Sequence, residues 1–128
     1  MPFKDNDKAI YLQIADGICD SVLTGILSSG DRIPSVREYA ARMGVNANTV
    51  MRSYEYLDQK GIIFNKRGIG FFIGENAAES IRHERRETFF NGEAESYFRR
   101  MASIGLTPEE VASLYATYLK ELDNRKEP

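Results

Sequence analysis

The spacing of apolar residues in this chain changes at Gly61, and that change limits most what the chain can fold into. Before Gly61 the apolar residues recur at helical intervals, whereas 62–66 and 71–73 are two short segments rich in Ile and Phe. Segments of this length and composition predict strands. Residues 67–70 join them and include two glycines, which suit a tight hairpin turn with positive φ. The pattern therefore predicts a mainly α fold with a small β-hairpin.

Three helical segments precede the hairpin. Apolar residues at every fourth position across 9–24 predict an amphipathic helix with a broad apolar face. Ser35 and Glu38, three residues apart, form a capping box that should start a second helix running to Met43. A third helix is expected over 45–60, with the glycine after it in the left-handed conformation that commonly follows a helix.

The residues after the hairpin predict two further helices. The stretch 75–103 contains no proline and carries apolar residues at alternating spacings of four and three. Thr107–Glu110 forms a second capping box, with a proline at the first helical position, where proline is favoured. We therefore expect two parts in this chain, a domain over residues 1–75 and a helical tail over residues 76–128.

Charge and hydropathy exclude several classes of protein. The net charge is −2, but the window Asp31–Arg67 holds seven bases and four acids, a local excess that permits DNA binding without requiring it. No stretch approaches the ~20 apolar residues that span a bilayer. The N-terminus Met1–Asn6 lacks the layout of a secretory signal, and the single cysteine, Cys19, cannot form an internal disulfide. These features predict a cytoplasmic protein without membrane contact.

The segment 34–61, together with the hairpin, carries the functional pattern. Three helices followed by a two-stranded wing form a winged helix-turn-helix, which is a DNA-reading architecture. A helix fits the major groove, where base edges present distinguishable donors and acceptors, and the preceding helix braces it across the backbone. Asn can pair with adenine and Arg with guanine, so polar residues near the start of the third helix suit this role. The candidate base-reading residues are Asn46, Asn48, Thr49 and Arg52.

Residues 11–73 resemble the winged-helix domain of the GntR family of bacterial transcription regulators. The resemblance covers about half of the chain, and its segments stand in the order and at the spacing of the family. They are Tyr11–Asp16, Gly30–Ala40, Gly44–Val50, Tyr54–Leu57, Gly61–Ile63 and Arg67–Phe72. Taken together, they imply a winged helix-turn-helix that binds a double-stranded DNA operator.

The resemblance also implies roles for individual residues. The family's Pro-Ser-x-Arg motif falls on Ser35 and Arg37, and its arginine would reach DNA from the start of the bracing helix. The tip of the wing, at Arg67, Gly68 and Gly70, would enter or flank the minor groove. Apart from the resemblance, Lys66 is expected to be a phosphate contact at most. The candidate DNA contacts on the wing are Lys66, Arg67, Gly68 and Gly70.

The tail is short for this family. Only 54 residues follow Gly74, whereas most members append a much larger sensor domain, and this length is similar to the YtrA-type subfamily. That likeness implies a homodimeric repressor held together by the tail, often of a transporter operon, and a symmetric dimer would bind an inverted repeat. Independently, so small an apolar helix pair cannot bury all its apolar surface on itself and needs another surface, either the winged domain or a second chain. The expected dimer interface comprises Phe90, Ala94, Tyr97, Met101, Val111, Leu114, Tyr118 and Leu122.

Two other functions remain open at the level of sequence. Ala47 and Met51 stand where many family members carry arginine, and with the acidic net charge they favour a winged protein-interaction module that does not read DNA. A small ligand held between the tail and the winged domain would instead make an effector-controlled switch. An enzyme is not expected, because the sequence offers no candidate nucleophile–base pair. His83 is the only histidine, so the residues needed for a His-based metal cluster or a catalytic triad are lacking. No cofactor is expected either.

Overall fold

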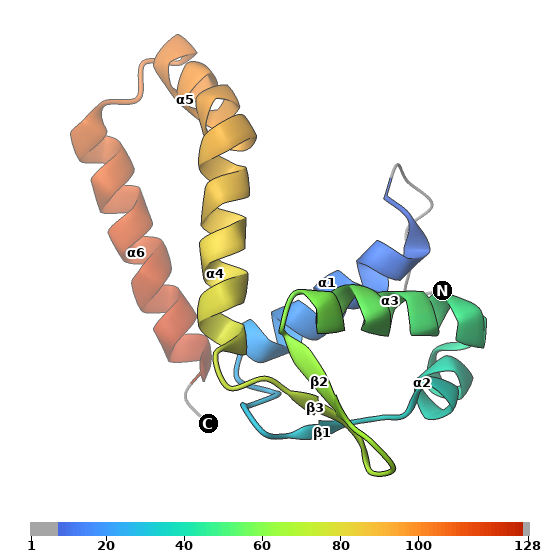
Figure 1. Cartoon of the computed structure of the whole chain (residues 1–128). Coiled ribbons are helices and arrows are strands. Elements are labelled where there is room, and N and C mark those ends of the chain that lie inside the picture. The colour runs from blue at the N-terminus through green and yellow to red at the C-terminus, as the bar shows by residue number, and fades with distance from the viewer. Residues whose placement is uncertain (1–7, 127–128) are drawn as a thin grey trace. The chain divides into compact units, whose positions relative to one another are not determined.

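The computed structural model describes residues 8–126, and the chain divides into two compact units between Arg85 and Arg86. The described residues form six helices, three short strands and one π-turn (Figure 1), so the predicted mainly α fold class is confirmed. Met1–Asn6, on which the expectation of no secretory signal rests, lie outside the described residues. Within the described part of the chain, no helix is both long enough and apolar enough to cross a membrane.

Three helices make up most of the first unit. They are α1 (Ile10–Leu23), α2 (Val36–Met43) and α3 (Ala47–Gln59), and each falls within its predicted range. Both α1 and α2 pack against α3. The four-residue periodicity of α1 places Ile14 and Ile18 in the core, as expected for an amphipathic helix.

The predicted helix ends are confirmed. Ser35 Oγ accepts a hydrogen bond from Glu38 N at 3.1 Å, and Glu38 Oε1 accepts one from Ser35 N at 3.2 Å. These hydrogen bonds from Ser35 lower the pKa of the Glu38 carboxyl. Gly44 and Gly61 follow α2 and α3 with φ of +67° and +74°, a left-handed conformation that glycine adopts without steric cost.

The wing is a three-stranded antiparallel sheet, one strand more than the predicted hairpin. β2 (Ile63–Lys66) and β3 (Gly70–Ile73) form the hairpin itself. β1 (Arg32–Ile33) pairs with the other edge of β3 and places Arg32 opposite Phe72. A two-residue strand is too short to show an alternating pattern, so the sequence gives no sign of it. It forms because β3 offers backbone partners that are distant in sequence.

The core lies between the three helices and the inner face of the sheet. The Tyr54 hydroxyl donates a hydrogen bond to the Pro34 carbonyl at 2.7 Å, and its ring meets that of Phe71 edge-on, with centroids 5.0 Å apart. Burial raises the pKa of Tyr54, and it raises the pKa of the Cys19 thiol to about 11. The largest fully buried side chains are Tyr54, Ile14, Leu57, Ile63, Ile73 and Val50.

The first unit also includes the start of α4 (Ala77–Thr88). Ala77 and Ile81 are buried in the same core as the three helices. One turn further on, the Arg85 guanidinium donates a hydrogen bond to the Asp20 carboxylate of α1 at 2.7 Å. These contacts explain why the first unit continues as far as Arg85.

The second unit is helical. After α4 the chain passes through the π-turn η1 (Phe89–Glu93) into α5 (Ala94–Ser103), so the segment that the sequence predicts to be helical is helical without a break. The π-turn widens one turn of the helix and shifts the side-chain register, which periodicity did not reveal. α6 (Pro108–Lys126) begins at the predicted second capping box, where Thr107 Oγ1 accepts a hydrogen bond from Glu110 N at 3.1 Å.

Most large apolar side chains of the second unit face solvent. Among the residues predicted at the dimer interface, Ala94 is buried within the chain, and Met101, Val111 and Leu122 are half-buried. The other predicted interface residues are exposed, and further apolar side chains join them. We call these residues the apolar tail surface: Phe90, Tyr97, Phe98, Leu114, Tyr115, Tyr118 and Leu119.

Candidate nucleic-acid interface

The α2–α3 pair is built around a tight turn at Gly44. Val45 N donates a hydrogen bond to the Ala40 carbonyl at 3.1 Å, which closes the end of α2. Asn46 then takes the N-cap position of α3, and its side-chain oxygen accepts a hydrogen bond from Asn48 N at 2.8 Å. Asn46, one of the predicted base-reading residues, therefore caps the helix that carries the others.

One side of α3 is buried and the other faces solvent. Asn48, Arg52 and Glu55 are exposed and, at spacings of four and three, share one face of the helix. Thr49 is half-buried at the edge of that face. The predicted base-reading side chains thus lie outside the core. The buried side consists of Val50, Ser53, Tyr54 and Leu57.

Arg52 lies against α1. Its Cζ is 4.0 Å from the centroid of the Tyr11 ring, a cation–π distance. The Tyr11 ring in turn meets Tyr56 of α3 edge-on, with centroids 6.2 Å apart. The Tyr11 carbonyl accepts a hydrogen bond from the buried Ser53 hydroxyl at 2.7 Å. The guanidinium is therefore held at the outer face of α3 by a ring that α1 and α3 fix together.

The serine and the arginine of the Pro-Ser-x-Arg motif at the start of α2 lie in different environments. The Ser35 hydroxyl accepts the capping hydrogen bond, so its first task is to begin the helix. Arg37 lies exposed in the first turn. An exposed arginine at this point extends the basic surface from α3 to α2.

The tip of the wing has the predicted turn. Gly68 and Gly70 have φ of +79° and +144°, conformations that a side chain would strain. Arg67 is exposed at the tip. The Lys66 ammonium lies over the outer face of the sheet, 4.9 Å from the centroid of the Phe72 ring.

The sheet brings Arg32 alongside the wing. Arg32 is exposed on β1, and a Cβ added to Gly70 would come within 3.0 Å of Arg32 Nε. The Arg32 side chain therefore reaches along β3 from its place opposite Phe72 to the turn end of the wing. Arg32 was not among the predicted site residues, because its place on the wing sheet depends on the unpredicted pairing of β1 with β3.

A second residue missed by the sequence analysis is Glu55. It lies three residues after Arg52 and seven after Asn48, on the same exposed face of α3. A carboxylate there can accept a hydrogen bond from the N4 amino group of cytosine. The helical spacing from Asn48 is the signal that could have identified it.

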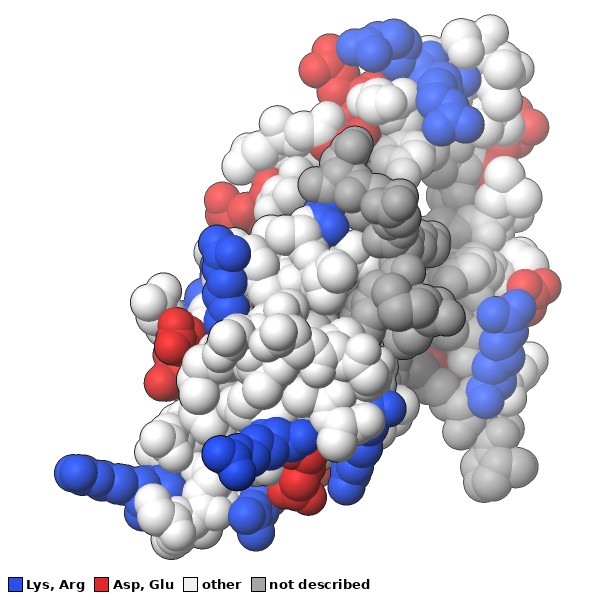
Figure 2. Space-filling view, turned by 90° about the vertical axis from the view of Figure 1, so that its right-hand side faces the viewer, with Lys and Arg blue, Asp and Glu red and all other residues white. Residues whose placement is uncertain are grey.

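Basic side chains gather on this part of the molecule. Figure 2 shows Lys and Arg side chains collected in the lower part of the view, with few acidic side chains between them. Such a surface attracts the phosphate backbone of DNA. The exposed bases of α2, α3 and the sheet are Arg32, Arg37, Arg42, Arg52, Lys66 and Arg67.

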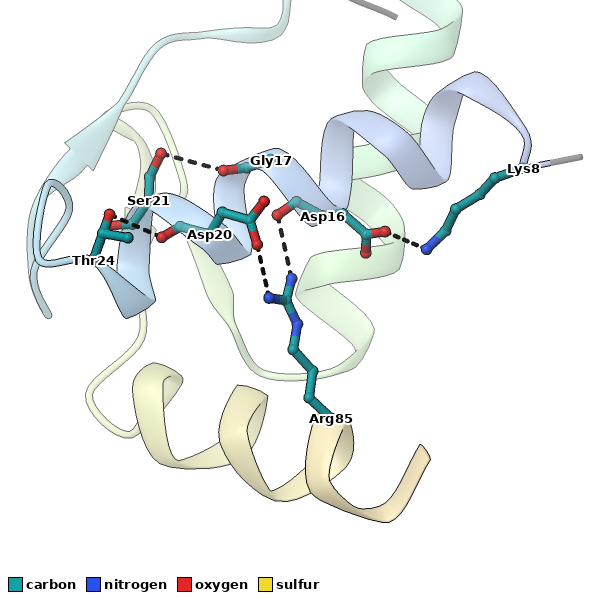
Figure 3. Close-up of polar contacts among 7 residues, drawn as sticks. All are labelled: Lys8, Asp16, Gly17, Asp20, Ser21, Thr24 and Arg85. Atoms are coloured by element: carbon teal, nitrogen blue, oxygen red, sulfur yellow. Dashed lines mark hydrogen bonds and ion pairs between the residues drawn. The ribbon is translucent and has the colours of Figure 1, made fainter. Parts of the chain in front are cut away.

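Arg85 has a structural role. Figure 3 shows its guanidinium between two acidic residues of α1, where it donates to the Asp20 carboxylate at 2.7 Å and to the Asp16 carbonyl at 3.4 Å. The Asp16 carboxylate is paired with Lys8. Arg85 therefore ties α4 to α1 and is not one of the exposed bases of α2, α3 and the sheet.

Comparison with known proteins agrees with this arrangement. The family model described as bacterial regulatory proteins, gntR family, matches residues 10–73, which contain α1 through β3. The chain belongs to the GntR family. Among solved structures, a GntR-family protein from Bacteroides thetaiotaomicron is 48% identical, with a TM-score of 0.70 over 89% of this chain and 99% of that chain.

Two relatives extend the comparison. The HTH-type transcriptional regulator YhcF of Bacillus subtilis is 38% identical over 113 residues, or 88% of this chain and 92% of that protein. The HTH-type transcriptional repressor YtrA of Bacillus subtilis is 43% identical over 72 residues, or 56% of this chain and 55% of that protein. The present protein is a DNA-binding transcription regulator of the GntR family, similar to YtrA, and it is not an enzyme.

Proposed function

We propose that this regulator is a homodimeric repressor that binds an inverted-repeat operator. The observation that carries the proposal is the apolar tail surface, in which Leu114 and Tyr115 are each 62% exposed and Phe90 is 59% exposed. Large exposed apolar side chains concentrated in one part of a chain are typical of an interaction site. We therefore expect a DNA-binding regulator with such a surface to dimerise.

A second copy of this chain suits the apolar tail surface best. Interfaces between identical subunits have more apolar cores than the rest of the protein surface. The residues from Asn76 onward hold eight bases and ten acids, so two identical tails have little net charge with which to repel each other. A two-fold dimer also doubles the number of recognition helices, which raises the specificity of a small domain.

The DNA side of the proposal uses the exposed face of α3 and its neighbours. Each α3 would lie in a major groove with Asn48 and Arg52 toward base edges, while Arg37 and the wing contact the adjacent backbone or minor groove. Half-sites separated by about one helical turn would then form a palindrome. Repression is inferred from the similarity to YtrA, which is named as a repressor.

The regulated genes are inferred from the resemblance to the YtrA-type subfamily, and we propose that they include a transporter operon. A genomic search with the operator obtained below tests this inference. Matches upstream of transporter genes would support it, and matches confined to promoters of unrelated genes would contradict it.

The central experiment is selection of the full-length protein on random duplex DNA, followed by footprinting and sedimentation at the same concentrations. We expect one enriched palindrome protected by a dimer. Arg37→Ala and Arg52→Ala should each weaken binding to it by about 1–3 kcal/mol, because an arginine contact is lost. Arg100→Ala is the matched control, since it removes the same charge from an exposed position of α5. Enrichment of no sequence, or binding by a monomer to one half-site, would contradict the proposal.

A further inference from the structure

We propose that Tyr11 is a positioning residue that presents Arg52 to a guanine of the operator. The proposal rests on the operator binding proposed above. It adds a residue of α1, outside the α2–α3 pair, to the residues that determine which base is read. The observation behind it is the position of the Arg52 Cζ, 4.0 Å from the centroid of the Tyr11 ring.

Tyr11 is itself fixed at two points, its ring and its main chain. Tyr56 meets it edge-on at an interplanar angle of 78°, and the half-buried ring packs at the junction of α1 and α3. The main chain of Tyr11 is held by the hydrogen bond from Ser53, whose hydroxyl is buried. A side chain that rests on this ring is therefore located relative to both helices.

The stacking leaves the reading edge of Arg52 available. A guanidinium carries its five N–H donors around the edge of a plane, and its faces carry none. We infer from the 4.0 Å between Arg52 Cζ and the ring centroid that a face of the guanidinium rests on Tyr11, which leaves accessible the paired donors that recognise guanine O6 and N7. Holding the side chain in place before binding also lowers the entropy cost of ordering it in the groove.

The Tyr11 ring holds Arg52 without occupying its N–H donors, as a carboxylate in an ion pair would. Across the described residues, no acidic side chain forms a salt bridge with Arg52, although Glu55 lies only three positions away. An ion pair would occupy the same donors that guanine needs. Arg52 thus donates the hydrogen bonds to guanine, and Tyr11 holds the Arg52 side chain in position.

The test compares Tyr11→Phe, Tyr11→Leu, Arg52→Ala and the Tyr11→Leu/Arg52→Ala double variant on the selected operator. Phenylalanine keeps the aromatic face, so Tyr11→Phe should bind as the wild type does. Leucine removes it, and Tyr11→Leu should weaken binding by about two- to five-fold at each half-site. It should also relax the guanine preference that Arg52→Ala abolishes. In the Arg52→Ala background, Tyr11→Leu should cause no further loss.

Two outcomes would overturn the proposal. Equal losses from Tyr11→Leu with and without Arg52 would mean that Tyr11 acts independently of it, and unchanged binding and base preference of Tyr11→Leu would mean that it does not act at all. If Tyr11→Leu does not fold, as judged by thermal melting, NMR of the free wild-type protein decides. The Tyr11 ring current should shift the Arg52 Hδ resonances upfield, and unshifted resonances would refute the contact. Failure of the wild type to select any operator would instead contradict the proposed function.

Discussion

The two units of this protein differ in where their large apolar side chains lie. In the first unit Tyr54, Leu57 and Ile63 are 0% exposed, packed between three helices and a sheet. In the second unit the buried apolar residue among those described is Ala94, while Leu114 and Tyr115 are each 62% exposed. Both units are rich in Leu, Ile, Phe and Tyr, so composition does not explain the difference.

The difference comes from the number of layers that each unit contains. A sheet and three helices surround one another's apolar faces, whereas two helices leave much of their surface uncovered. The winged unit buries its large apolar side chains within a single chain, and we expect the tail to bury its own against a second surface. Paired substitutions in the two units, taken from the largest expected effect to the smallest, test this conclusion.

The largest contrast is expected between Leu57→Ala and Leu114→Ala. Leu57 is 0% exposed, so its truncation leaves a cavity and should lower the free energy of unfolding by about 2–5 kcal/mol. Leu114 lies on the apolar tail surface, so its truncation should instead weaken dimerisation. Urea unfolding measures the first effect and sedimentation equilibrium the second. Similar losses of unfolding free energy in both variants, at concentrations where the protein is monomeric, would contradict the difference in burial between the two units.

Two glycines offer the next contrast. A Cβ added to Gly74 would lie 2.5 Å from the Gly61 carbonyl oxygen, a backbone atom that cannot move away cheaply. Gly74→Ala should therefore destabilise the first unit by about 1–3 kcal/mol, as overpacking does. A Cβ at Gly92 in η1 meets nothing within 4 Å, so Gly92→Ala should be neutral or slightly stabilising. Thermal melting of the two variants measures both effects, and a stable Gly74→Ala would show that the close approach is absent in solution.

The two capping boxes permit a matched pair with smaller effects. Ser35→Ala and Thr107→Ala each remove an N-cap and should each cost about 0.5–2 kcal/mol of stability. Only Ser35→Ala should also weaken operator binding, because it loosens the turn of α2 that carries Arg37. Operator titrations at a temperature where both variants are folded separate these effects. Equal binding by the two variants would indicate that the start of α2 does not contribute to DNA recognition.

The smallest effect concerns pH. Because hydrogen bonds from Ser35 lower the pKa of Glu38 in the folded protein, this carboxylate stabilises the fold above its unfolded pKa. That contribution is lost as the pH falls through the lower, folded pKa. We therefore expect Glu38→Gln to reduce the acid-dependent fall of the urea midpoint between about pH 5 and pH 3. An acid dependence as steep as that of the wild type would show that this capping box carries no linked proton.

Much of the winged unit could be predicted from local sequence. Capping and hydrophobic periodicity involve residues at most four positions apart, so the three helices, the capping box at Ser35 and the hairpin follow from short segments. Asn48 and Arg52 could be placed on an exposed face for the same reason. Glu55 lies on that face at the same helical spacing, so the local sequence places it there too.

Other features could not be predicted in this way. β1 consists of two residues, and Arg32 joins the wing only because Phe72 lies opposite it in the folded sheet. The π-turn at Phe89–Glu93 shifts the register within an apolar pattern that is regular in sequence. Arg85 stands in a basic run and would be taken for a surface charge, yet it pairs with Asp20, 65 positions earlier.

The sequence by itself determined the kind of fold, its family and the face of α3 that meets solvent, because these depend on residue types at short and regular spacing. The tertiary structure alone decided where the first unit ends, that Arg32 lies beside the wing, and that Tyr11 holds Arg52. Each of these depends on contact between residues more than thirty positions apart. Local periodicity and helix caps cannot predict such a contact, because it forms only when packing of the core brings the two segments together.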